Sequence, residues 1–227
     1  MALTPVLSRQ QTQRYCEDNY LLVSGLIPDA IAERAEAAMW RWIGLQPDDP
    51  ESWKNVQSSE TCDEPDVLAV YTPQLLTAAA QLGEGDMAPD VYRPPKGVRP
   101  INIFPQTGEW EPPGSHIDHA IKEHGHKTFP PAFRVATLTY LTDVEPHGGG
   151  TIVWSRSRDK IEALARSDPD RYEYMWVLNQ EYDREELGDY VELTPKRGDV
   201  LFYHVFCAHS GSKNVGRVPR FALPCKW

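Results

Sequence analysis

The sequence lacks long apolar segments, a secretion signal and runs of basic residues. No stretch reaches the roughly 18 uninterrupted apolar residues that a transmembrane helix needs. The opening residues MALTPVLSRQQTQRYCEDNY contain no basic segment followed by an apolar run. No run of five Lys or Arg residues occurs, and the formal charge of -10 argues against binding to nucleic-acid phosphates. We therefore expect no membrane or nucleic-acid partner.

Cysteine is also scarce, and its spacing has no motif. Cys16, Cys62, Cys207 and Cys225 form no C-x-x-C pair. They fit reduced, mostly buried thiols better than a disulfide framework, which predicts a soluble cytoplasmic protein. A chain of 227 residues can bury a substantial core, and we predict a single domain over residues 1–227. No pattern indicates an oligomeric state.

The first part of the chain carries helical patterns. Residues 24–44, SGLIPDAIAERAEAAMWRWIG, place apolar side chains at helical spacing, with Pro28 near the start. Residues 72–83, TPQLLTAAAQLG, predict a second helix, and residues 19–25 predict a short strand. Residues 45–64 are polar and have no period, which indicates a surface connection.

Short runs of β-branched and aromatic residues follow, each bounded by Gly, Pro or Asp. They lie at residues 98–106, 133–144, 150–155, 189–195 and 198–206. The charged stretch over residues 158–189 predicts a helical insertion among them. The sequence therefore predicts a mainly β fold with flanking helices, in which a helical layer of about residues 1–90 packs on a β-sandwich core of about residues 91–227.

The segment PPGSHIDHAIKEHGH, residues 112–126, holds four of the seven histidines. Residues two apart in a strand point to one face, so His116 and Asp118 can present an imidazole and a carboxylate to a single point. A nonheme Fe(II) site of two histidines and one carboxylate needs one more histidine. Because seven histidines and 33 acidic residues make a chance match easy, this H-x-D motif alone is a weak signal.

The missing ligand is expected near the end of the sequence, in RGDVLFYHVFCAHSGSKNVGRVPRFAL. His209 follows an apolar run there, and Arg220 lies within another. A guanidinium among apolar residues needs a carboxylate partner, and no acidic residue lies near Arg220 in sequence. His204 has no basic residue at a matching distance, so His209 is preferred. The alternative is that these are unrelated polar residues, with Arg220 on a surface edge strand.

Together these residues resemble the Fe(II)- and 2-oxoglutarate-dependent oxygenases, and within them the phytanoyl-CoA dioxygenase-like branch. The motif of that branch is H-x-D, a distal His and a basic residue for the far carboxylate of 2-oxoglutarate. The resemblance implies that His116, Asp118 and His209 are the catalytic metal ligands and that Arg220 anchors the cosubstrate. It extends over most of residues 12–225 and implies a double-stranded β-helix core, the jelly roll of the cupins.

A second branch is also similar. RVATLTYLTDVEPHGGGTIV and TPKRGDVLFYH resemble the prolyl-4-hydroxylase-like enzymes, which usually anchor 2-oxoglutarate with Lys, so Arg220 favours the first branch. The chain departs from that branch at WSRSRD, residues 154–159, where a Pro-Gly-Ser-His run is usual. Asp118 argues against the halogenating relatives, which have Gly or Ala at that position.

The resemblance implies an enzyme that uses Fe(II), 2-oxoglutarate and O2. It would hydroxylate a small-molecule or carrier-linked substrate, with oxidative decarboxylation of 2-oxoglutarate to succinate and CO2. Two alternatives stay open, which are a prolyl-4-hydroxylase-like protein or peptide hydroxylase and a non-catalytic, metal-binding cupin-like module. A peptide hydroxylase would need an open groove, whereas the loop at residues 119–133 is a candidate lid over a small-molecule pocket.

Other residues are weaker candidates. Hydrogen-bonding side chains expected near the cosubstrate are Asn102, Gln106, Thr139, Thr151, Ser210 and Ser212. Side chains that could meet an anionic substrate are Arg134, Trp154, Arg156 and Arg158. We expect His119, His124 and His126 to lie on the loop that leaves the site, where they contact substrate or face water.

Overall fold

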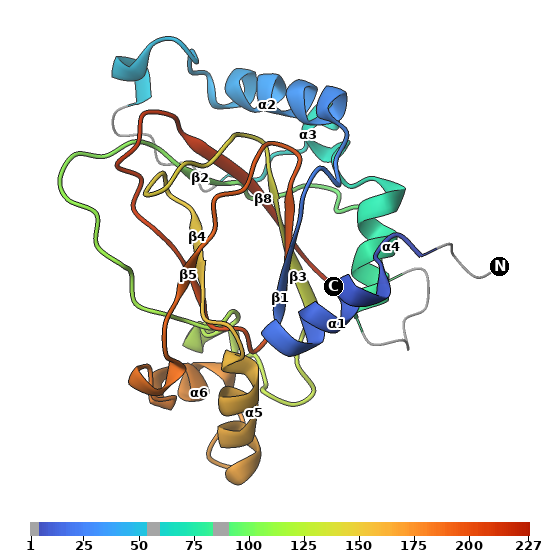
Figure 1. Ribbon diagram of the computed structural model, residues 1–227, viewed down its shortest axis with the longest axis vertical. Coiled ribbons are helices and arrows are strands. Elements are labelled where there is room, and N and C mark those ends of the chain that lie inside the picture. The colour runs from blue at the N-terminus through green and yellow to red at the C-terminus, as the bar shows by residue number, and fades with distance from the viewer. Residues whose placement is uncertain (1–4, 54–59, 84–90) are drawn as a thin grey trace.

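The computed structural model describes residues 5–53, 60–83 and 91–227. Its core consists of two antiparallel β-sheets with helices on the outside (Figure 1). The larger sheet has the strand order β1-β6-β3-β8-β2, and the smaller sheet has the order β5-β4-β7. The larger sheet contains β1 (Tyr20–Val23), β2 (Ile101–Ile103), β3 (Val135–Tyr140), β6 (Val200–His204) and β8 (Arg220–Lys226), and the smaller one contains β4 (Thr151–Val153), β5 (Val191–Glu192) and β7 (His209–Gly211).

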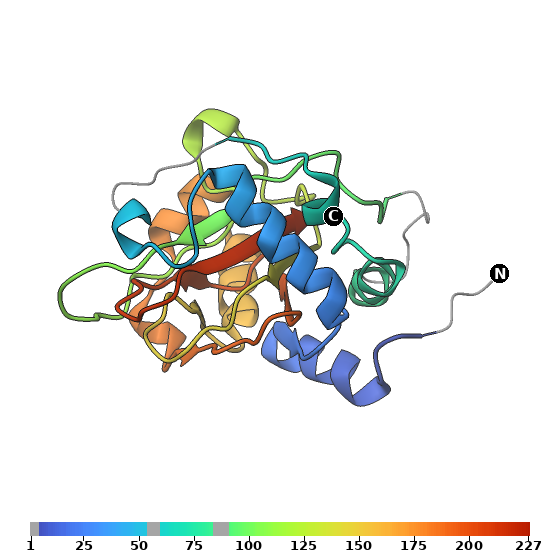
Figure 2. The ribbon, with the colours of Figure 1, turned by 90° about the horizontal axis from the view of Figure 1, so that it is seen from above.

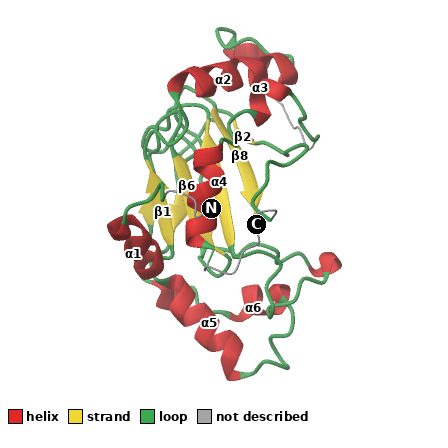
Figure 3. Ribbon diagram, turned by 90° about the vertical axis from the view of Figure 1, so that its right-hand side faces the viewer, coloured by secondary structure: helices red, strands yellow, loops and turns green. Residues whose placement is uncertain are grey.

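Helices from the N-terminal part cover the outer face of the larger sheet. Figure 3 shows α4 in front of this sheet, and Figure 2 shows α2 running across β8. The elements are α1 (Arg9–Asp18), α2 (Asp29–Ile43), the short η1 (Pro50–Trp53), α3 (Pro65–Leu68) and α4 (Pro73–Leu82). The predicted helical layer is present, and it also supplies β1, which pairs with β6 at the edge of the sheet.

Local sequence determines where the two predicted helices begin and end. Pro28 precedes α2, and Gly44 ends it with a φ of 71°, a left-handed conformation that glycine adopts without strain. Thr72 caps α4, because its side-chain oxygen accepts a hydrogen bond from the backbone N–H of Leu75 at 3.2 Å, and Pro73 fills the first helical position. Both helices therefore form within the ranges that the sequence predicts.

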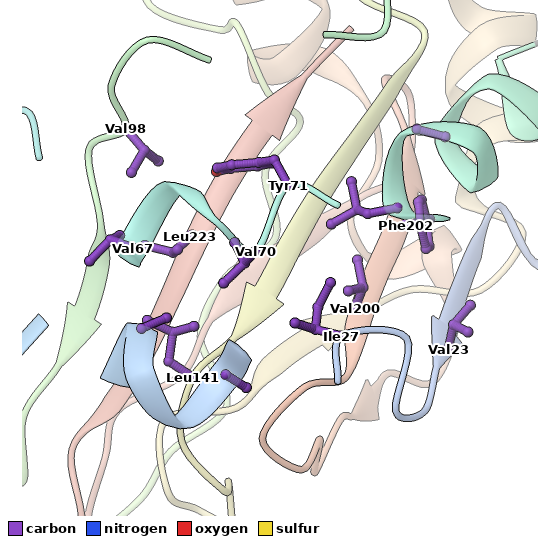
Figure 4. Packing of buried hydrophobic residues seen from close by; sticks show 14 of the residues in the cluster. Val23, Ile27, Val67, Val70, Tyr71, Val98, Leu141, Val200, Phe202 and Leu223 are labelled. Atoms are coloured by element: carbon purple, nitrogen blue, oxygen red, sulfur yellow. The ribbon is translucent and has the colours of Figure 1, made fainter. Parts of the chain in front are cut away.

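Side chains alternate between the two faces of the larger sheet, and each face has its own core. Val200, Phe202 and Leu223 point outward and pack under the helices, as Figure 4 shows. Leu201 and Ala222, their neighbours in sequence, point inward toward the smaller sheet. Because alternate residues of a strand point to opposite faces, only every second residue can reach the space between the sheets.

The predicted insertion is helical. It forms α5 (Ser157–Ser167), α6 (Met175–Glu181) and the short η3 (Glu185–Leu187), which lie together at one end of the sheets (Figure 1). Another short helix, η2 (Lys122–His124), follows the H-x-D segment. None of the helices in the described ranges is long and apolar enough to cross a membrane.

Candidate active site

A cavity of about 590 Å³ opens on the inward face of β8. Its wall includes Arg220, Pro224 and Lys226, which alternate with outward-facing residues along that strand. Residues from both sheets and from two connecting segments complete the wall: Pro95, Gly97, Val98, Arg99, Ile101, His116, Asp118, Leu138, Thr151, Tyr203, His209, Gly211 and Cys225. The cavity therefore contains the predicted ligand triad and the predicted anchor together.

The side chains of His116, Asp118 and His209 meet in this cavity. One possible ligand atom from each lies within 4.8 Å of the other two. His116 is exposed, Asp118 is half-buried and His209 is buried. In the parts of the chain that the structure describes, this is the one group of three or more His, Cys, Asp or Glu residues arranged to hold a metal ion. Two imidazoles and one carboxylate are the donor set that suits Fe(II).

Backbone pairing brings the two histidines together across 93 residues of sequence. His116 and His209 exchange both backbone hydrogen bonds, at 3.0 and 2.9 Å, as an isolated antiparallel bridge. The Nδ1 of His209 lies 2.9 Å from the carbonyl oxygen of Cys207. A proton on Nδ1 satisfies that carbonyl and leaves the Nε2 lone pair facing Asp118, the tautomer that a metal ligand needs.

Two donors hold the carboxylate of Asp118. Lys226 Nζ lies 2.9 Å from Oδ1, and the Tyr203 hydroxyl donates to Oδ2 at 2.9 Å. Burial alone would raise the pKa of Asp118, but His209, Lys226 and Tyr203 together lower it to about 2. Desolvation, and then the neighbouring His209, lower the pKa of His116 to about 4. At neutral pH the site thus offers a carboxylate and a neutral His116 imidazole, the protonation states that bind metals.

The helical insertion holds the H-x-D segment from its other side. Asn179 Oδ1 accepts a hydrogen bond from the backbone N–H of Ile117 at 2.9 Å. Ser115 and Tyr182 share a hydroxyl hydrogen bond of 2.8 Å, and Arg184 donates to the Ser115 carbonyl at 3.3 Å. The ligand segment is therefore fixed between β7 and α6, although it is not part of a regular strand.

Arg220 is buried in the cavity wall, with only 1% of its surface exposed. One guanidinium NH2 group donates to Thr151 Oγ1 at 3.3 Å and the other to the carbonyl of Ile101 at 3.2 Å. Its Nε has no hydrogen-bond partner, and no carboxylate among the described residues pairs with it. Burial lowers the pKa of Arg220, since a desolvated cation is unfavourable without a counter-ion. Arg220 is therefore a buried cation that the carboxylate of a bound molecule could neutralise.

Comparison with protein-family models decides the family. Residues 105–222, just over half of the chain, match the model described as phytanoyl-CoA dioxygenase. The chain belongs to the phytanoyl-CoA dioxygenase family. Enzymes of this family are 2-oxoglutarate-dependent nonheme iron oxygenases, and the predicted cofactors, Fe(II) and 2-oxoglutarate, are confirmed at the level of the family. Among curated proteins, none matches this sequence.

Solved structures show that the fold is shared more widely. The epimerase SnoN, in complex with Fe3+, alpha ketoglutarate and nogalamycin RO, has a TM-score of 0.66 at 16% identity, with 95% of this chain and 80% of SnoN covered. The carbocyclase SnoK from nogalamycin biosynthesis has a TM-score of 0.65 at 17% identity, with 99% of this chain and 85% of SnoK covered. EvdO2 from Micromonospora carbonacea var. aurantiaca has a TM-score of 0.62 at 13% identity, with 100% of this chain and 96% of EvdO2 covered. These likenesses confirm the predicted jelly-roll core.

Six side chains were predicted to lie near the cosubstrate. Thr151 is the one of them that lines the cavity. Thr151 Oγ1 accepts from Arg220 and lies 2.8 Å from the hydroxyl of Tyr140. Asn102 pairs with the outward-facing Phe221, and its amide contacts Met39 of α2 at 3.5 Å. The other candidates outside the cavity wall are Gln106, which is exposed, and Thr139, Ser210 and Ser212, which are buried.

The remaining histidines lie outside the triad. The rings of His119 and His126 stack with centroids 4.1 Å apart, and that of His124 lies 5.7 Å from His126. No residue from 119–133 lines the cavity; this loop instead bonds to the insertion, where Met175 N–H donates to the His126 carbonyl at 2.9 Å. The structure therefore does not place the predicted lid over the site.

The residues suggested for an anionic substrate are also outside the cavity wall. Arg134 and Arg158 line a separate cavity of about 160 Å³ beside the buried His204, and neither Trp154 nor Arg156 faces the candidate site. Sequence reasoning missed Lys226, Tyr203, Tyr140 and Asn179. Of these, Lys226 had a usable signal, because it lies six residues after Arg220 in one apolar run and so shares its face in a strand.

Proposed function

We propose that the chain hydroxylates a small organic molecule with Fe(II), 2-oxoglutarate and O2, using His116, Asp118 and His209 as metal ligands and Arg220 as the cosubstrate anchor. The observation that carries this proposal is the buried guanidinium of Arg220, which faces the same cavity as the three ligating side chains and has no carboxylate partner in the described structure. This combination suits an enzyme that binds a dicarboxylate beside a metal.

The residues present fit both groups. His116, Asp118 and His209 would hold Fe(II), and Arg220, assisted by Thr151, would hold the far carboxylate of 2-oxoglutarate. When bound, these groups supply oxidative decarboxylation of 2-oxoglutarate to succinate and CO2, coupled to oxidation of a substrate C–H bond.

The chain's own residues orient the groups of the site. Lys226 and Tyr203 fix the rotamer of Asp118, and because each carboxylate oxygen has two acceptor positions, Oδ2 can accept from Tyr203 and still face His209. Val98, Ile101 and Leu138 contribute apolar side chains to the wall beside the metal ligands.

A small-molecule substrate is favoured over a peptide. The cavity of about 590 Å³ lies in the ordinary size range of small-molecule pockets, which is about 300 to 1,000 Å³. The SnoN complex contains nogalamycin RO, which is also a small molecule. A single domain, a cytoplasmic location and a carrier-linked substrate stay predictions from the sequence and the family.

Anaerobic titration tests the proposal directly. Addition of 2-oxoglutarate to the protein with Fe(II) should produce the weak visible charge-transfer band of the chelate. Asp118→Ala should lose the band with the metal, and Arg220→Met should need much more 2-oxoglutarate. If wild-type protein binds Fe(II) but shows no band and forms no succinate, the chain is a metal-binding module and not an oxygenase.

A further inference from the structure

Two cavities meet beside the candidate iron site. The second cavity, of about 580 Å³, adjoins the first because both are lined by Pro95, Cys225 and Lys226. Lys226 pairs with Asp118 in the first cavity and also lies on the wall of the second. The two cavities are therefore direct neighbours beside the candidate iron site.

The charged side chains on these walls are almost all basic. Among the residues that the structure describes, the two cavities are lined by one acidic residue, Asp118, and by five Lys or Arg residues: Arg93, Lys96, Arg99, Arg220 and Lys226. The chain as a whole has a formal charge of -10, so this is a local reversal of sign. In the proposed function, Arg220 binds 2-oxoglutarate and Lys226 pairs with Asp118. Three cations, which we call the basic rim, are left: Arg93, Lys96 and Arg99.

The basic rim belongs to one short segment, RPPKGVR, residues 93–99, which contains no acidic residue. All three side chains are exposed, and none forms an ion pair with any described residue. The segment is held in place, because Val98 exchanges backbone hydrogen bonds of 2.7 and 2.9 Å with Cys62. Its two consecutive prolines further restrict the backbone. The rim is thus a positioned group of cations at the mouth of the cavities.

An apolar surface lies between the basic rim and the metal ligands. Val98, Ile101, Leu138 and Pro224 line the first cavity, and Ile101 is 42% exposed. A ligand that covers this surface must itself be apolar over that length. Its end at the mouth would meet the basic rim.

We propose that the substrate is an amphipathic small molecule whose anionic group, a carboxylate or a phosphate ester, binds the basic rim while its apolar part lies along Ile101 and Leu138 toward the iron site. The anion binding follows from the two cavities alone, and only the statement that the ligand is a substrate rests on the proposed function. Since the rim is exposed to solvent, its contribution is modest and depends on salt: we expect a preference of about tenfold for an anionic over a neutral ligand at low ionic strength.

Calorimetry with three matched probes tests this binding. Octanoate, octyl phosphate and the neutral octanol are titrated into anaerobic protein that holds Fe(II) and 2-oxoglutarate. In wild type, at least one anionic probe should bind about tenfold more tightly than octanol, and the preferred head group distinguishes a carboxylate from a phosphate ester. The preference should decrease as salt is added.

Two triple variants with the same change in charge provide the comparison. Arg93→Gln with Lys96→Gln and Arg99→Gln should reduce the preference to near unity. Arg9→Gln with Arg14→Gln and Arg217→Gln removes three exposed cations outside both cavities and should retain it.

The proposal is overturned if wild type binds no anionic probe, if octanol binds equally well, or if both triple variants lose the preference to the same degree. The charge-transfer band of the iron chelate, recorded on the same samples, reports separately on the proposed function. If the charge-transfer band appears but no anionic probe is preferred, the proposed substrate class is wrong and the proposed function stands. If an anionic probe is preferred but no band appears, the oxygenase assignment is wrong and the anion-binding site stands.

Discussion

Replacing Arg220 with Met should separate cosubstrate binding from folding. The guanidinium can offer two N–H groups to a carboxylate, and at about 1.5 kcal/mol for each charge-assisted bond the loss is about 3 kcal/mol. That loss corresponds to a dissociation constant for 2-oxoglutarate that is roughly 150-fold larger. Few buried substitutions are expected to affect a ligand so strongly without also damaging the protein.

The ligand-free protein should tolerate the change because Arg220 is a buried cation that lacks a carboxylate partner in the described structure. Replacing buried charge by an apolar side chain of similar volume is often neutral or stabilising. The carbonyl of Ile101 loses a donor, which costs about 1 kcal/mol, while Thr151 keeps its hydrogen bond to Tyr140. We expect the free energy of unfolding without 2-oxoglutarate to stay within about 1 kcal/mol of wild type.

Thermal and urea unfolding with and without 2-oxoglutarate, in the presence of metal, measure both effects. At a concentration 100 times the wild-type dissociation constant, the ligand stabilises wild type by about 2.7 kcal/mol and the variant by only about 0.3 kcal/mol. Arg217→Met, at an exposed position three residues earlier, is the control and should behave as wild type. A ligand-free Arg220→Met protein that loses more than about 3 kcal/mol, with unchanged response to 2-oxoglutarate, would show that Arg220 is structural.

Three further outcomes are expected. His116→Ala and Asp118→Ala should each abolish metal-dependent succinate formation without unfolding the chain, and unchanged succinate in both would remove the ligand assignment. Asn179→Ala should weaken metal affinity by about 10- to 100-fold in calorimetry, because the Ile117 N–H loses the acceptor that positions the H-x-D segment; unaltered affinity would show that the bond is dispensable. Burial lowers the pKa of His204 to about 3, so between pH 6.5 and 3 the unfolded state binds a proton that the folded state excludes, and stability should fall as pH falls through this window. His204→Asn keeps an acceptor for the Phe206 N–H. In urea unfolding at a series of pH values, its free energy of unfolding should depend less on pH than that of wild type. The same pH dependence in both proteins would show that another group is responsible.

Much of the fold was accessible from the sequence because local patterns and packing agree. The apolar stripe over residues 24–44 and the proline at its start predicted α2, and the short β-branched runs predicted β2 to β6, whereas β7 and β8 lie outside those runs. The triad and anchor followed from the resemblance, since H-x-D, a distal histidine and a spaced arginine are features that a linear sequence displays. The structure brings those four side chains into one cavity.

Positions that depend on register or on packing of distant segments were not accessible. Asn102 lies next to Ile101, which lines the cavity, yet faces away from it because alternate residues of β2 point to opposite faces. A single sequence does not determine which of the two residues points toward the cavity. Asn179 holds the H-x-D segment through the way the insertion folds back, which no local pattern encodes. Lys226 was the exception, since the same alternation that placed Arg220 inward also places Lys226 inward.

The hydrogen bond between Arg220 and Thr151 joins β8 of the larger sheet to β4 of the smaller one. Arg220 would hold one end of a dicarboxylate, and a metal bound to His209 of β7 would hold the other end. The ligand would then connect the two sheets. Its binding should slow amide hydrogen exchange in strands of both sheets at once, including strands that do not touch it. Core substitutions that slide one sheet against the other would shorten or lengthen this span, and so alter cosubstrate affinity while leaving every ligand residue in place.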